Sequence, residues 1–200
     1  VSQMPSLKQR IIDALLSREF AFMLNNWILL GMMMFVLIAT TFPLMSEALR
    51  NETVTVGPAF YNRWMVPLGL VLLFLTGVGP LIAWRKASGK NLLRAFIVPS
   101  VVAGAALVLH IVVGPMIGFP PIMEAPEIYD TFTGKVLAVI FSAAPVSAFV
   151  VCAWVFAAIA QEFWRGTAMR MRNAKENVFL AFFRLIAKAR RRYGGYFVHI

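Results

Sequence analysis

The residues best suited to chemistry are the two histidines of the chain, His110 and His199. An ionisable side chain within an apolar, membrane-spanning run is a candidate functional group. Arg192, Tyr196 and His199 are spaced i, i+4, i+7, so a helix would present them on one face. Because helical side chains lean over the preceding turn, His199 would project over Gly195, where no side chain obstructs it.

A flat porphyrin requires this kind of arrangement beside a helix. The His199 imidazole would ligate the iron, the gap at Gly195 would give clearance, and the Arg192 cation would pair with a propionate. Spacing alone, however, favours a simpler alternative, in which His199 is hydrogen bonded to a neighbouring helix. The residues permit haem binding without establishing it.

The second histidine, His110, lies sixteen residues beyond Arg94, which is about 24 Å along a helix. In straight spans this places His110 and His199 at different depths, so they would not ligate one iron. We therefore expect a structural or outer-face role for His110. The single cysteine, Cys152, cannot form an intrachain disulfide and is expected to pack as a small buried residue. The sequence contains no metal-ligand cluster, nucleophile–base pair or Gly-rich phosphate loop, so any catalysis would depend on a cofactor.

The elements that must position these residues are membrane helices. The chain is 60% hydrophobic and 14% charged, whereas soluble domains are about half apolar and a quarter charged. Apolar runs of about 20 residues span a bilayer as helices. The predicted complete spans are residues 20–44, 64–84, 95–118 and 135–163, and a fifth span begins within residues 193–200.

Two polar stretches are predicted to form amphipathic helices on the membrane surface, residues 1–19 and part of the basic segment 164–192. The stretch from Gly77 to Pro80 in span two should face other helices, because Pro80 leaves a backbone carbonyl unpaired. The predicted fold class is an all-α, polytopic integral membrane protein with one membrane domain. Since the chain begins at Val1 and stops just after the fifth span begins, we expect a piece of a longer protein.

The charges predict the orientation of the chain. When the loops are assigned to alternate sides, one side receives all but three of the nineteen lysines and arginines. The exceptions, Arg50, Arg63 and Lys135, share the other side with five of the nine acidic residues. The positive-inside rule then places the N-terminus and the 164–192 segment in the cytoplasm. Topology and anionic lipid account for the net charge of +10, so we expect no nucleic-acid partner.

Six short motifs follow one another along the chain. They are Ser17-Arg18-Glu19 with Asn25-Asn26, Phe42-Pro43-Leu44 with Ser46-Glu47, Val56 to Arg63, Gly79-Pro80-Leu81 with Trp84-Arg85, Glu162 to Gly166, and Arg192 to Tyr196 with His199. In this order they resemble the central part of the CcmF family of cytochrome c-type biogenesis proteins, which are haem lyase subunits. A nitrite-reductase maturation paralogue shares much of this pattern.

The resemblance implies a multi-pass protein of the bacterial inner membrane that promotes covalent attachment of haem to apocytochrome c. It implies a bound haem b, with His199 as an axial ligand of the iron and Arg192, Gly195 and Tyr196 as supporting residues. The implied partners are a haem chaperone that delivers haem, apocytochrome c and other cytochrome c maturation membrane subunits, besides the lipid bilayer. The Trp-rich outer segment of the family is absent from these 200 residues, so we do not expect them to catalyse haem ligation alone.

Two other functions fit the residues. A kinked span two would suit the pathway of a secondary transporter without a cofactor, and the chain would also suit a purely structural membrane subunit. A transporter built from repeats should carry a second Gly/Pro-broken span at a corresponding position. The sequence shows no such repeat.

Overall fold

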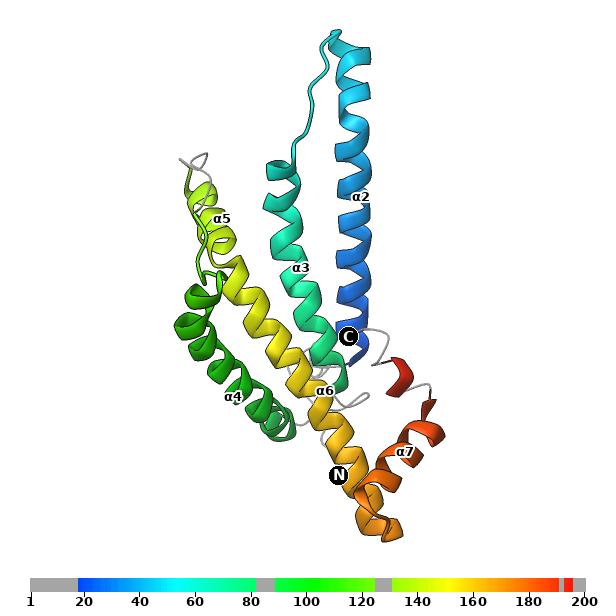
Figure 1. Ribbon diagram of the computed structural model, residues 1–200. Coiled ribbons are helices and arrows are strands. Elements are labelled where there is room, and N and C mark those ends of the chain that lie inside the picture. The colour runs from blue at the N-terminus through cyan, green and yellow to red at the C-terminus, as the bar shows by residue number, and fades with distance from the viewer. Residues whose placement is uncertain (1–17, 82–88, 125–130, 191–192, 196–200) are drawn as a thin grey trace, which may run out of the picture.

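The computed structural model describes residues 18–81, 89–124, 131–190 and 193–195, and every regular element in these ranges is a helix (Figure 1). The helices are α2 (Arg18–Arg50), α3 (Pro58–Leu81), α4 (Gly89–Val113), the short 3-10 helix η1 (Gly114–Ile117), α5 (Phe132–Ser142), α6 (Ala144–Ala174) and α7 (Val178–Lys188). The predicted all-α fold class is confirmed. The surface helix predicted at residues 1–19 lies almost entirely outside the described residues.

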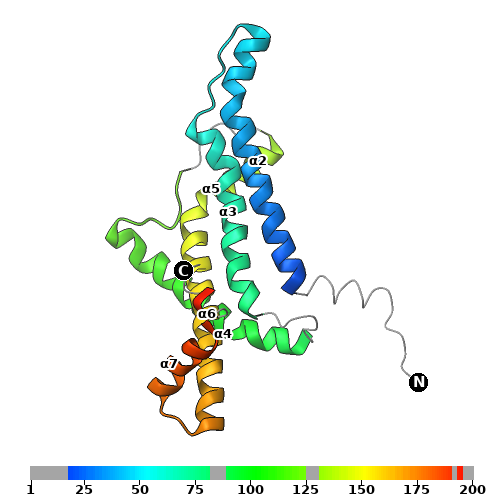
Figure 2. The ribbon, with the colours of Figure 1, turned by 90° about the vertical axis from the view of Figure 1, so that its right-hand side faces the viewer.

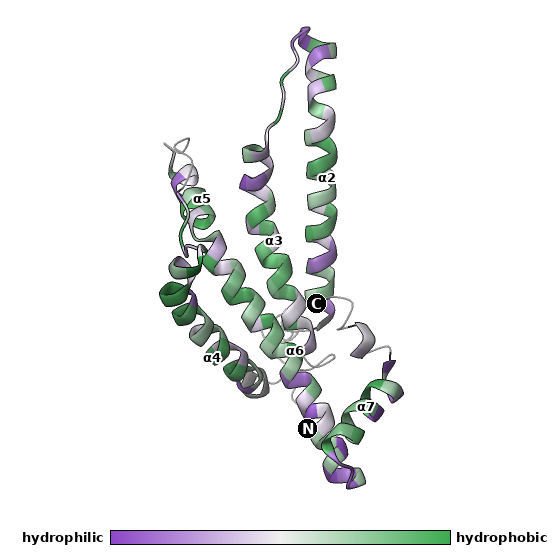
Figure 3. Ribbon diagram, in the orientation of Figure 1, coloured by the Kyte–Doolittle hydropathy of each residue, from purple (hydrophilic) through white to green (hydrophobic). Residues whose placement is uncertain are grey.

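Four of the described helices are long and apolar enough to cross a membrane, namely α2, α3, α4 together with η1, and α6. They alternate in direction along the chain, and α2 and α3 lie side by side in both views (Figures 1 and 2). Apolar residues make up most of their middle parts, whereas polar residues gather near the helix ends and at the turn between α6 and α7 (Figure 3). The chain is therefore a multi-pass membrane protein.

The fourth predicted span, residues 135–163, is not one continuous helix. The structure divides it into α5 and α6 at Ala143. Pro145 has no backbone N–H and cannot continue the hydrogen-bond ladder of α5. The carbonyl oxygen of Ser142, in the last turn of α5, accepts a hydrogen bond from the N–H of Met123, at 3.0 Å. The preceding turn thus supplies the partner that an apolar environment demands.

Helix α6 also runs further than the predicted span, to Ala174, so the segment 164–192 begins as helix rather than loop. After a turn, Asn177 caps α7 by accepting a hydrogen bond from the N–H of Val178. The charged residues of α7, Arg184 and Lys188, are one helical turn apart, and Ala181 is buried against the rest of the structure. The amphipathic helix predicted within this segment is confirmed as α7.

Helix α6 is central to the packing, since it contacts α3 on one side, α4 on another and α7 near its end. The indole of Trp154 fills the space between α3 and α4, with ring centroids 4.8 Å from Phe74 and 5.3 Å from Phe96. Its N–H donates to the hydroxyl of Ser100 at 3.4 Å. Gly77 makes room for the ring, because a Cβ there would lie 2.8 Å from the indole.

The residues from Gly77 to Leu81 are all buried, so the prediction that this part of span two faces other helices is confirmed. Small residues let membrane helices approach closely, and the resulting van der Waals contacts hold the helices together. The close approach of α3 and α6 therefore depends on the missing side chain at Gly77.

We expect Gly77→Ala to lower the stability of the folded protein by about 1–3 kcal/mol, because the added methyl group overlaps Trp154 and Val155. Gly69→Ala is the matched control in the same helix, since a Cβ at Gly69 meets no atom within 4 Å. The measurement is thermal unfolding in detergent. Equal midpoints for the two variants would contradict tight packing at Gly77.

An ion-pair network stabilises the turn between α6 and α7. The Glu176 carboxylate lies 2.7 Å from Arg184 and 3.3 Å from Arg170, and its side chain is 9% exposed. The hydrogen bond from Arg184, and then the positive charge of Arg170, hold the pKa of the Glu176 carboxyl below its ordinary value. Because the folded-state pKa is depressed, this stabilisation is present above the unfolded-state pKa and is lost as pH falls through the folded-state pKa.

Glu176→Gln should therefore lower the unfolding midpoint at neutral pH slightly, by about 1–2 °C, as is typical of one ion-pair network near a surface. The difference from the unmodified protein should disappear when the pH falls below the folded-state pKa, where Glu176 itself is protonated. Unfolding midpoints measured across this pH range check the effect. A difference that is constant with pH would show that the charge of Glu176 is unimportant.

Candidate functional site

The predicted haem-binding residues fall at the edge of what the structure describes. Arg192, Tyr196 and His199 lie outside the described residues, so their placement stays a prediction. Gly195 is described, is helical and is half-buried. The structure thus describes residues 193–195, the segment that leads to the candidate site. It also describes the surface against which this segment packs.

Tyr193 holds this segment against the rest of the structure. Its side chain is only 4% exposed, its ring centroid lies 4.9 Å from that of Phe163, and its N–H donates to the carbonyl of Ala189. Its hydroxyl packs against Gly166 of α6, where an added Cβ would overlap both the hydroxyl and the methyl groups of Leu185. The missing side chain at Gly166 therefore determines where Tyr193 sits.

This contact joins two motifs that are well separated in the sequence, Glu162 to Gly166 and the segment that begins at Arg192. Sequence reasoning treated them as separate features and missed their contact. The available signal was Gly166 itself, a residue that weakens a helix and is usually present for a packing reason. In the structure that reason is the Tyr193 side chain.

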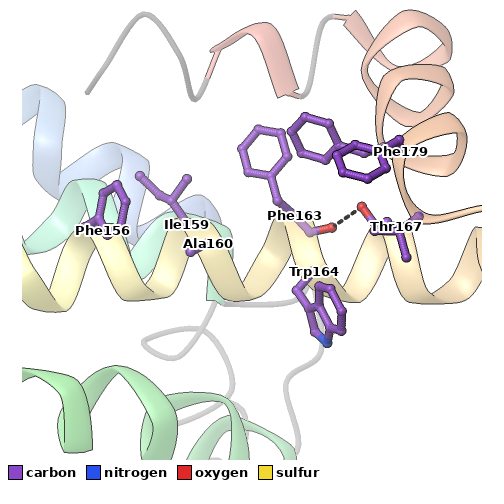
Figure 4. A pocket seen from close by; sticks show the side chains of 9 residues that line it. Phe156, Ile159, Ala160, Phe163, Trp164, Thr167 and Phe179 are labelled. Carbon is purple, nitrogen blue, oxygen red and sulfur yellow. Dashed lines mark hydrogen bonds between the residues drawn. The ribbon is translucent and has the colours of Figure 1, made fainter.

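An apolar cavity of about 440 Å³ lies next to Tyr193, between α6 and α7 (Figure 4). Phe163, which contacts Tyr193, lines the cavity together with Ile159 and Phe179. The hydroxyl of Thr167, which also lines it, donates to the carbonyl of Phe163 at 2.9 Å and is thereby satisfied. The cavity suits a flat or elongated apolar group.

A second cavity, of about 330 Å³, lies where α2, α3 and α6 meet. Asn25, Gly79 and Pro80 line it, and Ile159 borders both this cavity and the one beside α7. Residues from four of the six motifs therefore gather around the same part of α6. The remaining two motifs meet at the other end of the α2–α3 pair, where Phe42 of one motif and Val56 and Phe60 of the other line a common cavity.

His110 lies near the end of α4, away from α7, and is 8% exposed. Its ring stacks on Phe149 of α6 with centroids 4.7 Å apart, a packing contact between α4 and α6, and the predicted structural or outer-face role stays a prediction. Within the described part of the chain, no group of three or more His, Cys, Asp or Glu residues could hold a metal ion. The structure does not test whether His110 and His199 lie at different depths, because His199 is not described.

The expectation that Cys152 is buried is wrong, because its side chain is exposed on α6. Lipid tails solvate a small apolar residue about as well as a protein interior does, so burial confers little advantage there. Cys152 instead borders the cavity that His110 lines.

Curated proteins of cytochrome c-type biogenesis are similar to this chain over about half of its length. CcmF of Pseudomonas aeruginosa is 32% identical over 103 residues, which are 52% of this chain and 16% of the relative. CycK of Bradyrhizobium diazoefficiens is 41% identical over 81 residues, or 40% of this chain and 12% of the relative. CcmF of Escherichia coli is 30% identical over 92 residues, or 46% of this chain and 14% of the relative.

No protein-family model matches the sequence, and no solved structure matches it either. The matched segments span only 12–16% of the length of these relatives. The similarity is nevertheless shared by several proteins that carry the same description, and it agrees with the ordered motifs. Over about half of its length, the chain is homologous to the CcmF and CycK cytochrome c-type biogenesis proteins.

Proposed function

We propose that this chain is part of a membrane protein of cytochrome c maturation and that His199 is an axial ligand of a b-type haem. The partial homology to cytochrome c-type biogenesis proteins carries the proposal of function. The assignment of His199 rests on the Tyr-Gly-Gly motif that precedes it and on the resemblance to the family.

The described residues next to the candidate site are compatible with a bound haem. A porphyrin face is apolar, and the cavity beside Phe163 is lined by aromatic and aliphatic side chains. The buried Tyr193 fixes the start of the segment that carries His199. Arg192 and Tyr196 would hold the polar propionates at the headgroup level, and Gly195 would leave clearance for the ring. The bound haem would supply a redox-active iron, which could keep incoming haem reduced.

The partners and location follow from the same homology. We place the protein in the bacterial inner membrane, with the N-terminus of these residues in the cytoplasm. The full-length protein would receive haem from a haem chaperone and promote its attachment to apocytochrome c together with other maturation subunits. The outer-side segments 47–63 and 119–133, which contain the connections between α2 and α3 and between η1 and α5, would face these partners. Since the matched segments are a small part of each relative, we expect these 200 residues alone to be inactive.

His199→Ala in the full-length protein should remove or shift the b-type haem absorption, because the iron loses an axial ligand. His110→Phe is the matched control, because it replaces the other histidine of the chain. Its spectrum should equal that of the unmodified protein. The measurement is the absorption spectrum of the purified, reduced protein. An unchanged spectrum for His199→Ala would show that His199 is not a ligand.

Gly166→Ala should displace Tyr193 and with it the start of the segment that leads to His199. We expect a loss of stability of about 1–3 kcal/mol and a shifted haem absorption. Gly31→Ala is the control, since a Cβ at Gly31 meets no atom within 4 Å. Adding Tyr193→Phe removes the overlapping hydroxyl and should restore part of the stability, a non-additivity that a double-mutant cycle measures. Strict additivity would contradict the contact.

A further inference from the structure

A third cavity, of about 730 Å³, lies at the other end of α6, between α4, α6 and the turn that follows η1. Its volume falls within the range of about 300–1,000 Å³ that is usual for small-molecule sites. Its lining includes no Asp, Glu, Lys or Arg among the described residues. The polar side chain most suited to hydrogen bonding in this lining is His110.

The imidazole of His110 has an unmet hydrogen-bonding requirement. Nε2 is buried and has no hydrogen-bond partner within the described part of the chain. A buried N–H without an acceptor is rarer in proteins than a buried acceptor without a donor. The ring proton is therefore better placed on Nδ1, which leaves Nε2 with its lone pair. One face of the ring is stacked on Phe149, so a ligand cannot approach from that face.

The Nδ1–Cε1 edge of the ring lies beside Gly114, where a side chain would not fit. A Cβ at Gly114 would be 3.5 Å from both ring atoms and 2.5 Å from the carbonyl oxygen of Phe119. The chain is held in this shape by the N–H of Phe119, which donates to the carbonyl of Gly114 at 2.9 Å. The His110 ring and the Phe119 carbonyl, which can supply a hydrogen-bond donor and an acceptor, thus both lie beside Gly114, and both residues line the same otherwise apolar cavity.

The cavity opens among exposed apolar side chains. Leu109 and Ile117, which line it, are 56% and 63% exposed, and Cys152 is exposed beside them. In a membrane these side chains are bathed by hydrocarbon, so a molecule dissolved in the bilayer can reach the cavity from the side. The apolar lining excludes a charged or water-soluble ligand.

We propose that this cavity binds a lipid-soluble molecule that carries one hydroxyl group on a hydrocarbon body. The hydroxyl oxygen accepts a hydrogen bond from Nδ1 of His110, and the hydroxyl proton is donated to the carbonyl oxygen of Phe119. A hydroxyl meets both requirements because it is donor and acceptor at once. The apolar body fills the rest of the cavity. This site is independent of haem binding at His199.

Photolabelling of the full-length protein in detergent tests the site. The probe is a long-chain primary alcohol that carries a mid-chain diazirine, and its methyl ether is the matched control compound. We expect the alcohol to label residues 109–123 and the facing part of α6, and His110→Phe to reduce this labelling about tenfold. The phenyl ring keeps the stack on Phe149 but has no N–H. The ether, which cannot donate to Phe119, should label as weakly as the alcohol labels His110→Phe.

Two further variants keep the test decisive. Ala148→Phe fills the cavity from α6 and should also abolish labelling. Val101→Phe changes a 66% exposed residue of α4 that does not line the cavity, and should leave labelling intact. Thermal unfolding identifies the variants that fold, and if His110→Phe does not fold, Ala148→Phe decides. Equal labelling by alcohol and ether, or undiminished labelling of a folded His110→Phe or Ala148→Phe, would overturn the site.

Discussion

The indole of Trp154 occupies the place where α3, α4 and α6 meet, and the arrangement of the membrane helices depends on it. The ring contacts Phe74 of α3 and Phe96 of α4, and it donates to Ser100 of α4. Gly77 provides the space that the ring needs. Helices in lipid gain little from burying apolar surface, so such shape-matched contacts and interhelical hydrogen bonds determine which helices pair.

The same environment governs the break between α5 and α6. A helix that ends inside a membrane leaves its last carbonyls without donors from the same helix, so they must find donors elsewhere in the protein. The turn before α5 supplies the N–H of Met123 to the carbonyl of Ser142. This bond brings the turn against α6, and the turn then forms one wall of the cavity lined by His110. A local requirement of the backbone thus shapes a cavity that includes residues far apart in the sequence.

Much of the fold could be predicted from the sequence, because long apolar runs with few charges have few possible structures in a bilayer. The break at Ala143 was not predicted, since a proline within a membrane helix can bend it or end it, and neighbouring residues decide which. The contact of Gly166 with Tyr193 and the exposure of Cys152 depend on which faces of α6 meet other helices. Hydropathy cannot distinguish a helix face that contacts lipid from one that contacts protein, because both surroundings are equally apolar. For the candidate site, the residues could be predicted from the sequence, whereas the packing of Tyr193 against α6 is seen only in the structure.

The unbroken length of α6 has a mechanical consequence. Its 31 residues extend about 46 Å, whereas the hydrocarbon core of a bilayer is about 30 Å thick. A continuous helix is stiff on this scale, so a tilt imposed at one end reappears at the other. The cavity beside His110 borders the first turns of α6, and the Tyr193 anchor packs against its last third. The helix is therefore one continuous rod, longer than the hydrocarbon core is thick, that runs from the cavity beside His110 to the Tyr193 anchor.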